Sequence, residues 1–245
     1  MDSPEARGND YANVTNMVKE PKGVDMPRTA RAIVGGMYYH VLNRGNNRAP
    51  VFHSDTDYAQ FVGLISEAQN RIAMDVIAQC LMPNHFHLLV RVPEDESLGK
   101  WMQWLLTSHV RQYHKHHRTS GRVWQGRFKA FPVQDDAHLL TVMRYVERNA
   151  LTANLVERAE AWPWGSLHWR VNGNTKIDLV APPIKIPEHW VAYVNQPITA
   201  HEHERFKTCI HRQQPFGEQG WVKRTAQLLG LESSLNAIGR PRTTA

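Results

Sequence analysis

The chain contains the stretch Leu81-Met-Pro-Asn-His-Phe-His-Leu-Leu-Val-Arg-Val92. Its apolar residues predict a β-strand, in which successive side chains point to opposite faces of the sheet. His85 and His87 therefore share one face, while Phe86 points to the other. Two neutral imidazoles on one face can supply half of the ligands of a divalent-metal site. The alternative is a pair of half-buried histidines that form only hydrogen bonds, and the stretch alone leaves both interpretations open.

The segments around this stretch predict an α+β fold. Residues 74–82 are expected to pair with the histidine strand through the Pro83-Asn84 turn, as an antiparallel hairpin. Two more strands are expected at residues 37–43 and 127–133, and three helices are expected to begin after Ser54, Ser97 and Asp136 and to end near Arg71, His117 and Thr152. The order β-α-β-β-α-β-α is typical of a ferredoxin-like antiparallel sheet with helices packed mainly on one face.

These elements define a main domain with a segment on either side. Residues 1–33 are polar and lack periodicity, which predicts a disordered leader. Residues 34–169 hold the predicted sheet and helices and are expected to form the main domain. Residues 170–245 are expected to form a C-terminal extension that is rich in loops, with short helices near residues 201–213 and 216–229 and a basic tail.

The composition of the 245-residue chain argues against several classes of protein. No apolar run reaches the roughly 18 residues needed to cross a bilayer, and no signal peptide is visible. We therefore expect a cytoplasmic protein without a membrane partner. The two cysteines, Cys80 and Cys209, are far apart and form no CxxC motif, which argues against a disulfide framework and a cysteine-based zinc site.

The net charge of +6 is concentrated in one segment. Residues 100–148 hold nine Lys or Arg and three acidic residues, which accounts for the whole net charge. Histidines and aromatic residues lie among these basic groups, a combination that suits a phosphate backbone with stackable bases. A solvated helix face is the alternative, but such a face usually mixes charges of both signs. The segment therefore favours nucleic-acid binding.

Several residues are candidates for contact with DNA. Arg127 and Lys129 alternate on the last predicted strand and so face one side of the sheet. Trp124 can stack on a base or can anchor its loop in the core, and the sequence leaves both open. The remaining candidates are arginines in the first turn, on the helix after Asp136 and in the C-terminal tail: Arg44, Arg48, Arg144, Arg148, Arg240 and Arg242.

A tyrosine and an amide lie on the helix that follows the last strand. Tyr145 and Asn149 are four residues apart and therefore share one helix face. A phenol has a pKa of about 10, so its attack on phosphorus needs nearby cations or a divalent ion. The alternative is a half-buried tyrosine beside a helix-terminal asparagine. Tyr113, which neighbours several histidines in the preceding helix, is a rival nucleophile.

Five motifs in a fixed order give the chain a family resemblance. They are Tyr39-His-Val-Leu-Asn-Arg44, Met82-Pro-Asn-His-Phe-His-Leu-Leu89, Gly121-Arg-Val-Trp-Gln-Gly-Arg-Phe-Lys129, Arg144-Tyr-Val-Glu-Arg-Asn149 and Trp162-Pro-Trp-Gly-Ser166. The chain resembles the REP-associated tyrosine transposases of bacteria, which are insertion-sequence-200-like members of the HUH class of single-strand DNA nucleases. Phe216-Gly-Glu-Gln-Gly-Trp221 and Gly239-Arg-Pro241 resemble the C-terminal extension of longer members.

The resemblance implies a metal-dependent endonuclease and strand transferase that acts on single-stranded DNA. It assigns Mg²⁺ or Mn²⁺ to His85, His87 and Asn149, and it assigns the nucleophile to Tyr145 through a covalent 5′-phosphotyrosine intermediate. It also implies hairpin-forming repeats as the substrate, association with the bacterial nucleoid and a homodimer. The chain departs from the family at Ala150, where members commonly have proline, and this change concerns the helix end more than the chemistry.

Two other functions would use part of the same set of residues. A domesticated protein that binds DNA hairpins without cutting them would need the basic surface but not the full set of two histidines, tyrosine and asparagine. A rolling-circle initiator or relaxase would use the same pair of histidines. Such proteins usually have a third histidine ligand or further domains, which the sequence does not show.

Overall fold

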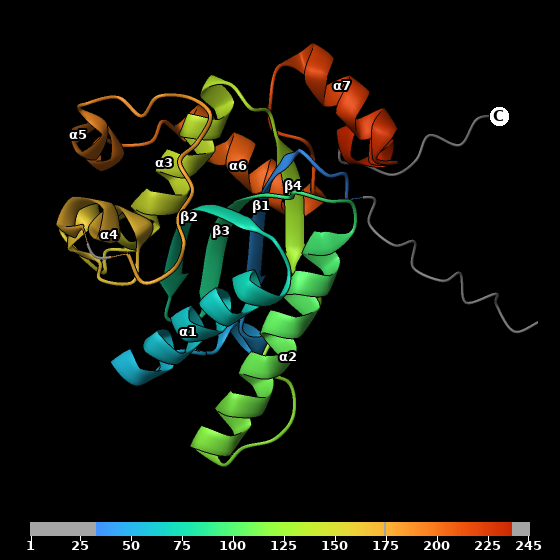
Figure 1. The fold of residues 1–245 in the computed structure, drawn as a ribbon. Coiled ribbons are helices and arrows are strands. Elements are labelled where there is room, and N and C mark those ends of the chain that lie inside the picture. Colours follow the sequence, from blue (N-terminus) through green and yellow to red (C-terminus); the bar gives the residue numbers. More distant parts are fainter. Residues whose placement is uncertain (1–32, 174, 237–245) are drawn as a thin grey trace, which may run out of the picture. The chain divides into compact units, whose positions relative to one another are not determined.

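The fold is given by a computed structural model that describes residues 33–173 and 175–236. Its elements are β1 (Tyr38–Arg44), α1 (Asp55–Arg71), β2 (Asp75–Met82), β3 (His85–Arg91), α2 (Ser97–His117), β4 (Lys129–Val133), α3 (Ala137–Thr152), α4 (Ser166–Asn172), α5 (Trp190–Asn195), α6 (Ala200–Arg212) and α7 (Gln219–Leu228), with short 3-10 helices η1 (Asn46–Arg48), η2 (Ala159–Ala161) and η3 (Glu232–Leu235) (Figure 1). The predicted leader, up to residue 32, and the tail with Arg240 and Arg242 lie outside the described residues.

The four strands form one antiparallel sheet in the order β2-β3-β1-β4. β3 lies between β2 and β1, so the histidine strand has a hydrogen-bonded neighbour on each side. His87 is paired in register with Cys80 of β2 and with Leu42 of β1. The predicted hairpin of β2 and β3 and the predicted α+β class are confirmed.

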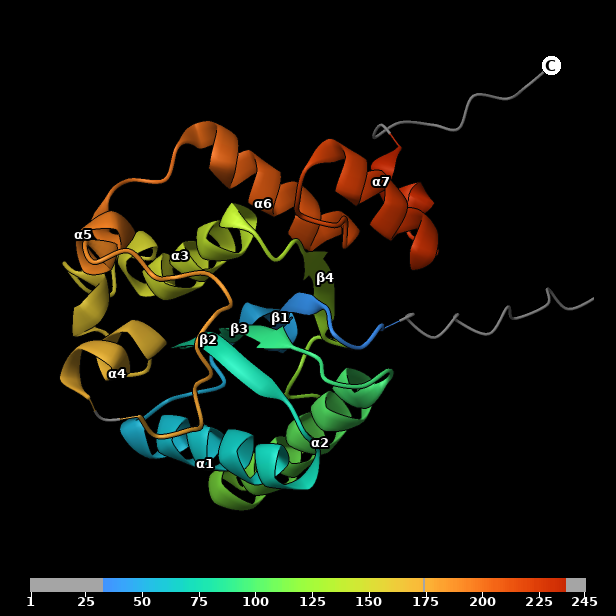
Figure 2. The same cartoon turned by 45° about the horizontal axis from the view of Figure 1, so that its top comes forward.

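Helices cover both faces of the sheet, which differs from the expectation of helices mainly on one face. Phe86, Leu88 and Val90 of β3 join one buried cluster with side chains of α1 and α2. Leu89 joins a second cluster with side chains of α3 and α6, including Phe206. Figure 2 shows α1 and α2 on one side of the sheet and α3 and α6 on the other. The physical reason is that the interior strands are apolar on both faces, so that each face needs a cover.

Two of the three predicted helix caps are confirmed, and the third lies at a different residue. Ser54 and Asp57 form a reciprocal capping box at the start of α1. Asp136 caps α3 by accepting a hydrogen bond from the backbone N–H of His138. The expected cap at Ser97 is displaced, because Ser97 is the first residue of α2 and its hydroxyl donates to the carbonyl of Glu94.

The segment after α3 returns to the sheet. α4 spans the position, between residues 169 and 170, where the sequence placed the boundary of the C-terminal extension. The two short helices expected in the extension correspond to α6 and α7. α6 packs on β4 and on α3 through Phe206, which is buried. Within the described residues, no helix combines the length and the apolar character that a membrane span needs.

Candidate active site

His85 and His87 point from β3 toward α3, on the face of the sheet that belongs to the second cluster. Their ring centroids are 5.0 Å apart, so the alternation of the strand brings the two imidazoles together as predicted. His87 is buried, whereas His85 lies partly open at the end of the strand. The predicted pair therefore sits at the boundary between the core and solvent, where a ligand from solution can reach it.

A third imidazole, which the sequence reasoning missed, supports this pair. His40 of β1 is fully buried, and its Nε2 lies 2.9 Å from Nδ1 of His87. His85 has a different support: its Nδ1 lies 2.6 Å from Oδ1 of Asn84, an oxygen that can only accept, so Nδ1 of His85 donates. In the neutral imidazole, Nε2 of His85 therefore has a free lone pair. His40 and Leu42 are two residues apart on a predicted strand and so share one face. This spacing could have identified His40 as a residue of the histidine face.

All three imidazoles favour the neutral form. Burial lowers the pKa of His40 to about 3. Burial, followed by the charge of Arg44, lowers the pKa of His85 to about 4. The pKa of His87 lies well below its ordinary value because of burial and then because of its histidine neighbours and Arg44. A neutral imidazole is the form that binds a metal ion.

Tyr145 of α3 lies against the same histidine face. The ring of Tyr145 is perpendicular to that of His87, with centroids 5.6 Å apart, and it is 6.0 Å from the ring of His40. The Asn149 amide donates to the backbone carbonyl of Tyr145 at 2.8 Å. Burial raises the pKa of Tyr145 to about 12, although Arg44 and a hydrogen bond with the Asn149 side chain act in the opposite direction.

Phe206 of α6 covers the other side of the tyrosine ring. The two rings stack with centroids 4.2 Å apart and an interplanar angle of 23°. Phe206 in turn stacks on Phe216, with centroids 4.9 Å apart. Tyr145 is thus held between the histidines of the sheet and an aromatic pair from the C-terminal segment. The sequence reasoning did not connect α6 with the tyrosine.

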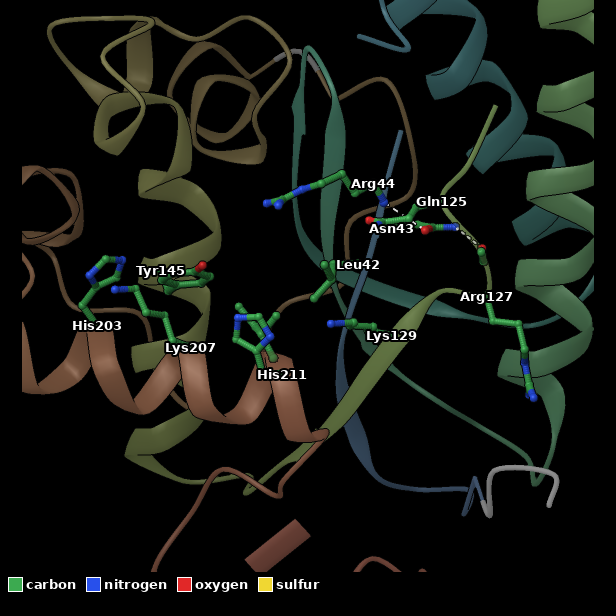
Figure 3. Close-up of a pocket in the computed structure, with 12 residues that line it drawn as sticks. Leu42, Asn43, Arg44, Gln125, Arg127, Lys129, Tyr145, His203, Lys207 and His211 are labelled. Atoms are coloured by element: carbon green, nitrogen blue, oxygen red, sulfur yellow. Dashed lines mark hydrogen bonds between the residues drawn. The ribbon is translucent and has the colours of Figure 1, made fainter. Parts of the chain in front are cut away.

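A cleft of about 520 Å³ opens beside Tyr145. Its walls are β1, the loop before β4 and α6, and its lining residues are Leu42, Asn43, Arg44, Gln125, Gly126, Arg127, Lys129, Tyr145, His203, Lys207, Ile210 and His211. Figure 3 shows the side chains of His203, Lys207 and His211 on α6, across the cleft from the strands. These three residues were missed, although their spacing of four places them on one helix face.

Only some of the predicted DNA-contact residues that the structure describes reach the cleft. Arg44, Arg127 and Lys129 line the cleft. Trp124 lies in the core with 6 % of its surface exposed, where its ring packs against aromatic rings that include Phe86. Of the two predicted roles of Trp124, the structure agrees with the one in which it anchors its loop in the core.

Arg144 and Arg148 do not point into the cleft. Arg144 is 4 % exposed, and its guanidinium donates to the carbonyls of Tyr193, Gln196 and Pro197. Arg148 donates to the carbonyl of Val194. Both arginines tie α3 to the segment around α5, and neither lines the cleft, so their contact with DNA stays a prediction. Arg48 belongs to η1 and is exposed. It does not line the cleft.

The rival tyrosine lies on the opposite face of the sheet. Tyr113 belongs to α2 and packs against the first cluster. Its hydroxyl lies 2.9 Å from Nε2 of His53. His117 from the last turn of α2 approaches Asp57 of α1, again away from His85 and His87. Tyr145 is therefore the tyrosine that faces the histidine pair.

Three comparisons place this geometry among known proteins. Residues 33–149 match the family model described as "Transposase IS200 like". A protein of Haemophilus influenzae described as a REP-associated tyrosine transposase is 27 % identical over an alignment of 146 residues, and the match covers 55 % of this chain and 81 % of that protein.

A solved structure of a REP-associated tyrosine transposase bound to a REP hairpin has a similar fold. Its TM-score is 0.50 at 18 % identity, and the match covers 71 % of this chain and 99 % of that one. The matched family segment contains all four strands, the histidine pair and both residues of the Tyr145–Asn149 pair. Residues 33–149 therefore match the IS200-like transposase family, and the chain is similar in sequence to a REP-associated tyrosine transposase.

Proposed function

We propose that the chain cuts and rejoins single-stranded DNA at hairpin-forming repeats, with Tyr145 as the nucleophile. The observation that carries the proposal is the position of Tyr145, whose ring lies 5.6 Å from that of His87 at the edge of a cleft lined by basic side chains. A nucleophile beside two neutral imidazoles, with cationic groups in the adjoining cleft, supplies the parts that phosphoryl transfer needs.

The residues of the site fit a divalent cation, Mg²⁺ or Mn²⁺. Nε2 of His85 is a free lone pair, because Nδ1 donates to Asn84. Nε2 of His87 also has a free lone pair when Nδ1 of His87 donates its hydrogen to His40. The side-chain oxygen of Asn149 would complete the set. When bound, the cation would withdraw charge from the phosphate and so favour attack on phosphorus.

The Tyr145 hydroxyl would attack the phosphorus of the scissile phosphodiester. The new bond joins Oη of Tyr145 to phosphorus, and the bond from phosphorus to the 3′ oxygen breaks. The phenol loses its proton, the 3′ oxygen gains one, and a 5′-phosphotyrosine forms together with a free 3′-OH. Attack by a 3′-OH reverses these steps and joins strands without ATP, because the phosphotyrosine conserves the energy of the broken bond.

The cleft supplies the contacts to the DNA backbone. Arg44, Arg127 and Lys129 extend from the strand side, and Lys207 extends from α6. Cationic side chains bind phosphates without regard to sequence, so these contacts would position the strand. The related structure holds a REP hairpin, which supports a folded hairpin as the substrate of this chain. A homodimer remains a prediction from the family resemblance.

The test is cleavage of a labelled hairpin with a single-stranded flank, in the presence and absence of Mn²⁺. The wild-type chain should release a shorter product only when the cation is present. A chain with His85→Ala and His87→Ala should bind the hairpin and fail to cut it. Binding without cutting by the wild-type chain, at every Mg²⁺ and Mn²⁺ concentration, would instead support a non-cleaving hairpin-binding protein.

A further inference from the structure

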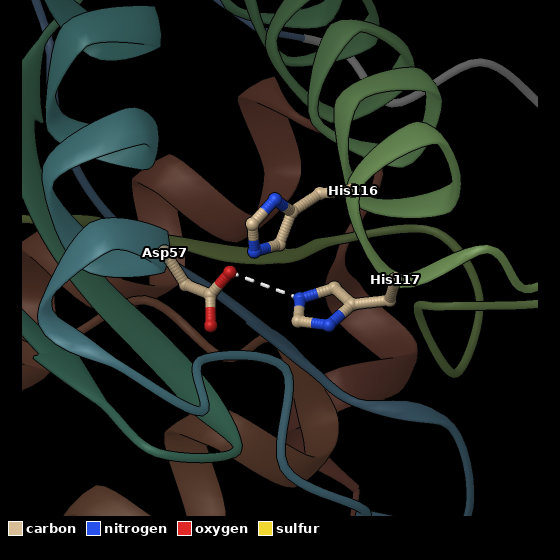
Figure 4. A group of neighbouring side chains, drawn as sticks. All are labelled: Asp57, His116 and His117. Carbon is tan, nitrogen blue, oxygen red and sulfur yellow. Dashed lines mark hydrogen bonds and ion pairs between the residues drawn. The ribbon is translucent and has the colours of Figure 1, made fainter.

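We propose a second metal site, for Zn²⁺ or a similar transition-metal ion, that joins α1 to α2 through Asp57, His116 and His117. The potential ligand atoms of these three residues all lie within 4.8 Å of one another. Figure 4 shows the carboxylate of Asp57 and the two imidazoles turned toward a common point. This site is separate from the Tyr145 site, because α1 and α2 cover the opposite face of the sheet.

The carboxylate of Asp57 is held in place by its neighbours in sequence. Oδ2 accepts hydrogen bonds from the backbone N–H groups of His53 and Ser54, at 2.8 and 3.0 Å, and from the Ser54 hydroxyl at 3.2 Å. Asp57 is 4 % exposed. Because one oxygen serves the start of α1, the other is fixed in direction and faces α2, where Nε2 of His117 lies 2.9 Å from it.

The two imidazoles come from the last turn of α2. α2 ends at His117, and the next residue, Arg118, adopts a left-handed conformation that turns the chain away. The His116 and His117 rings are 4.7 Å apart and nearly perpendicular, at 86°. Consecutive helical residues usually point in different directions, so the convergence of both rings near one carboxylate is a specific feature of this helix end.

Aromatic rings restrain the position of His117. Its ring is 4.4 Å from that of Tyr113 and 5.0 Å from that of His53. Tyr113 and His53 are themselves linked by the 2.9 Å contact between the phenol oxygen and Nε2. Ligands whose rotamers are already limited lose less conformational entropy when a metal ion binds.

The ligand set predicts which cation binds. Two imidazole nitrogens and one carboxylate oxygen suit Zn²⁺, with water as the fourth ligand. Ligand atoms around a tetrahedral Zn²⁺ lie ~3.4 Å apart. The 2.9 Å separation of the Asp57 and His117 atoms therefore has to widen by a few tenths of an ångström when the ion binds.

The place of the site in the chain gives the metal a structural role. α2 leads into the loop that carries Gln125 and Arg127 to the cleft beside Tyr145. An ion bound by Asp57, His116 and His117 would fasten the end of α2 to the first turn of α1. It would thereby restrain the start of this loop without taking part in the reaction.

The site is tested by titration of the chelator-treated full chain with Zn²⁺ in a calorimeter and with Co²⁺ by visible absorption, which reports tetrahedral coordination. The measurements use a His85→Ala/His87→Ala background, so that the Tyr145 site does not contribute. We expect one ion per chain in this background. His116→Ala and, separately, Asp57→Asn should weaken Zn²⁺ binding by at least about tenfold, since even residues outside the ligand shell affect affinity by that factor.

His114→Ala is the matched control. His114 belongs to the same helix turn, but its two ring nitrogens face Thr119 Oγ1 at 2.9 Å and the Gly121 carbonyl at 3.0 Å. This variant should keep the affinity of the background chain. Undiminished Zn²⁺ binding by the His116→Ala variant would overturn the proposal, and so would an equal loss in the His114→Ala variant. Because His116 is exposed, its replacement leaves the fold intact and decides the outcome even if Asp57→Asn unfolds the chain.

Discussion

Nε2 of His40 in β1 lies 2.9 Å from Nδ1 of His87 in β3, and both rings are buried beneath Tyr145. A single hydrogen atom occupies this contact, and its position decides what His87 can bind. If Nδ1 of His87 donates to His40, Nε2 of His87 presents a lone pair. If His40 donates instead, Nε2 of His87 carries the hydrogen and cannot hold a cation. We therefore treat His40 as a residue that positions and orients His87.

Replacement of His40 should change the affinity of the Tyr145 site for Mn²⁺. Phenylalanine at position 40 keeps a planar ring but cannot accept a hydrogen bond, so His40→Phe should weaken Mn²⁺ binding about 10- to 100-fold. Glutamine can accept with its side-chain oxygen, so His40→Gln should keep most of the affinity. Calorimetric titration with Mn²⁺ measures both, in a chain whose exposed His116 is also replaced. Equal losses in the two variants, matched by equal losses of thermal stability, would indicate that His40 only fills space.

The stacking of Phe206 on Tyr145 predicts a large effect on stability. Phe206 is 1 % exposed and joins α6 to α3, so Phe206→Ala should lower the free energy of unfolding by about 3 to 5 kcal/mol. Leu228 in α7 is the control, because it is 63 % exposed and its replacement by alanine should cost less than about 0.5 kcal/mol. Denaturant titrations of both variants measure the difference. A cost for Phe206→Ala as small as that for Leu228→Ala would show that α6 does not hold the tyrosine.

The arginines near the site should fall into two functional groups. Arg127→Gln removes a charge at the cleft, so it should weaken single-stranded DNA binding and reduce the slope of log affinity against log salt by about 0.7. Arg144→Gln should lower the melting temperature, since three backbone carbonyls lose a buried donor. Its salt slope should equal that of the wild type. Fluorescence anisotropy at several salt concentrations measures DNA binding, and thermal unfolding measures stability. A reduced salt slope for Arg144→Gln, together with an unchanged slope for Arg127→Gln, would contradict the assignment.

Sequence periodicity was sufficient for the parts of the site that depend on local structure. Strand alternation places His85 and His87 on one face, and helical spacing places Tyr145 above Asn149, because both follow from backbone geometry alone. Their meeting depends on the packing of α3 against the sheet, which no local pattern encodes. The family resemblance supplied that step, and the contact between Tyr145 and His87 agrees with it.

Charge in the sequence was a weaker guide than periodicity. Arg144 and Lys129 look equivalent in sequence, yet Arg144 is buried and satisfies backbone carbonyls, whereas Lys129 lines the cleft. The difference arises from the segment at residues 190–197, which is distant in sequence and packs over α3. Phe206 was missed for the same reason, since one aromatic residue in a polar helix does not reveal its partner.

The start of α6 should make stability depend on pH in the acidic range. Burial acts to raise the pKa of Glu202, but hydrogen bonds from Thr199 and the charges of Arg144 and His201 outweigh it and hold the pKa below the ordinary value of 4.5. A carboxyl with a lowered pKa in the folded chain stabilises it above pH 4.5, and this contribution is lost as the pH falls through the lowered value.

Glu202→Gln should therefore destabilise the chain at pH 7 and should reduce the dependence of stability on pH below pH 4.5. Unfolding in urea across this range measures the slope. Glu204 is the control, because it lies on the same helix but is exposed, so that solvent screens the Lys207 and His203 charges that lower its pKa. A pH slope unchanged by Glu202→Gln would contradict the assignment.

The covalent attachment of DNA to Tyr145 tests the central claim most directly. A hairpin oligonucleotide labelled at its 3′ end is incubated with the chain and Mn²⁺, and the mixture is separated on a denaturing gel. If Tyr145 attacks phosphorus and releases a 3′-OH, the 3′ label migrates with the protein for the wild-type chain and for Tyr113→Phe. It is absent from the protein band for Tyr145→Phe. A labelled protein band that persists in Tyr145→Phe, or that disappears in a folded Tyr113→Phe, would contradict the account.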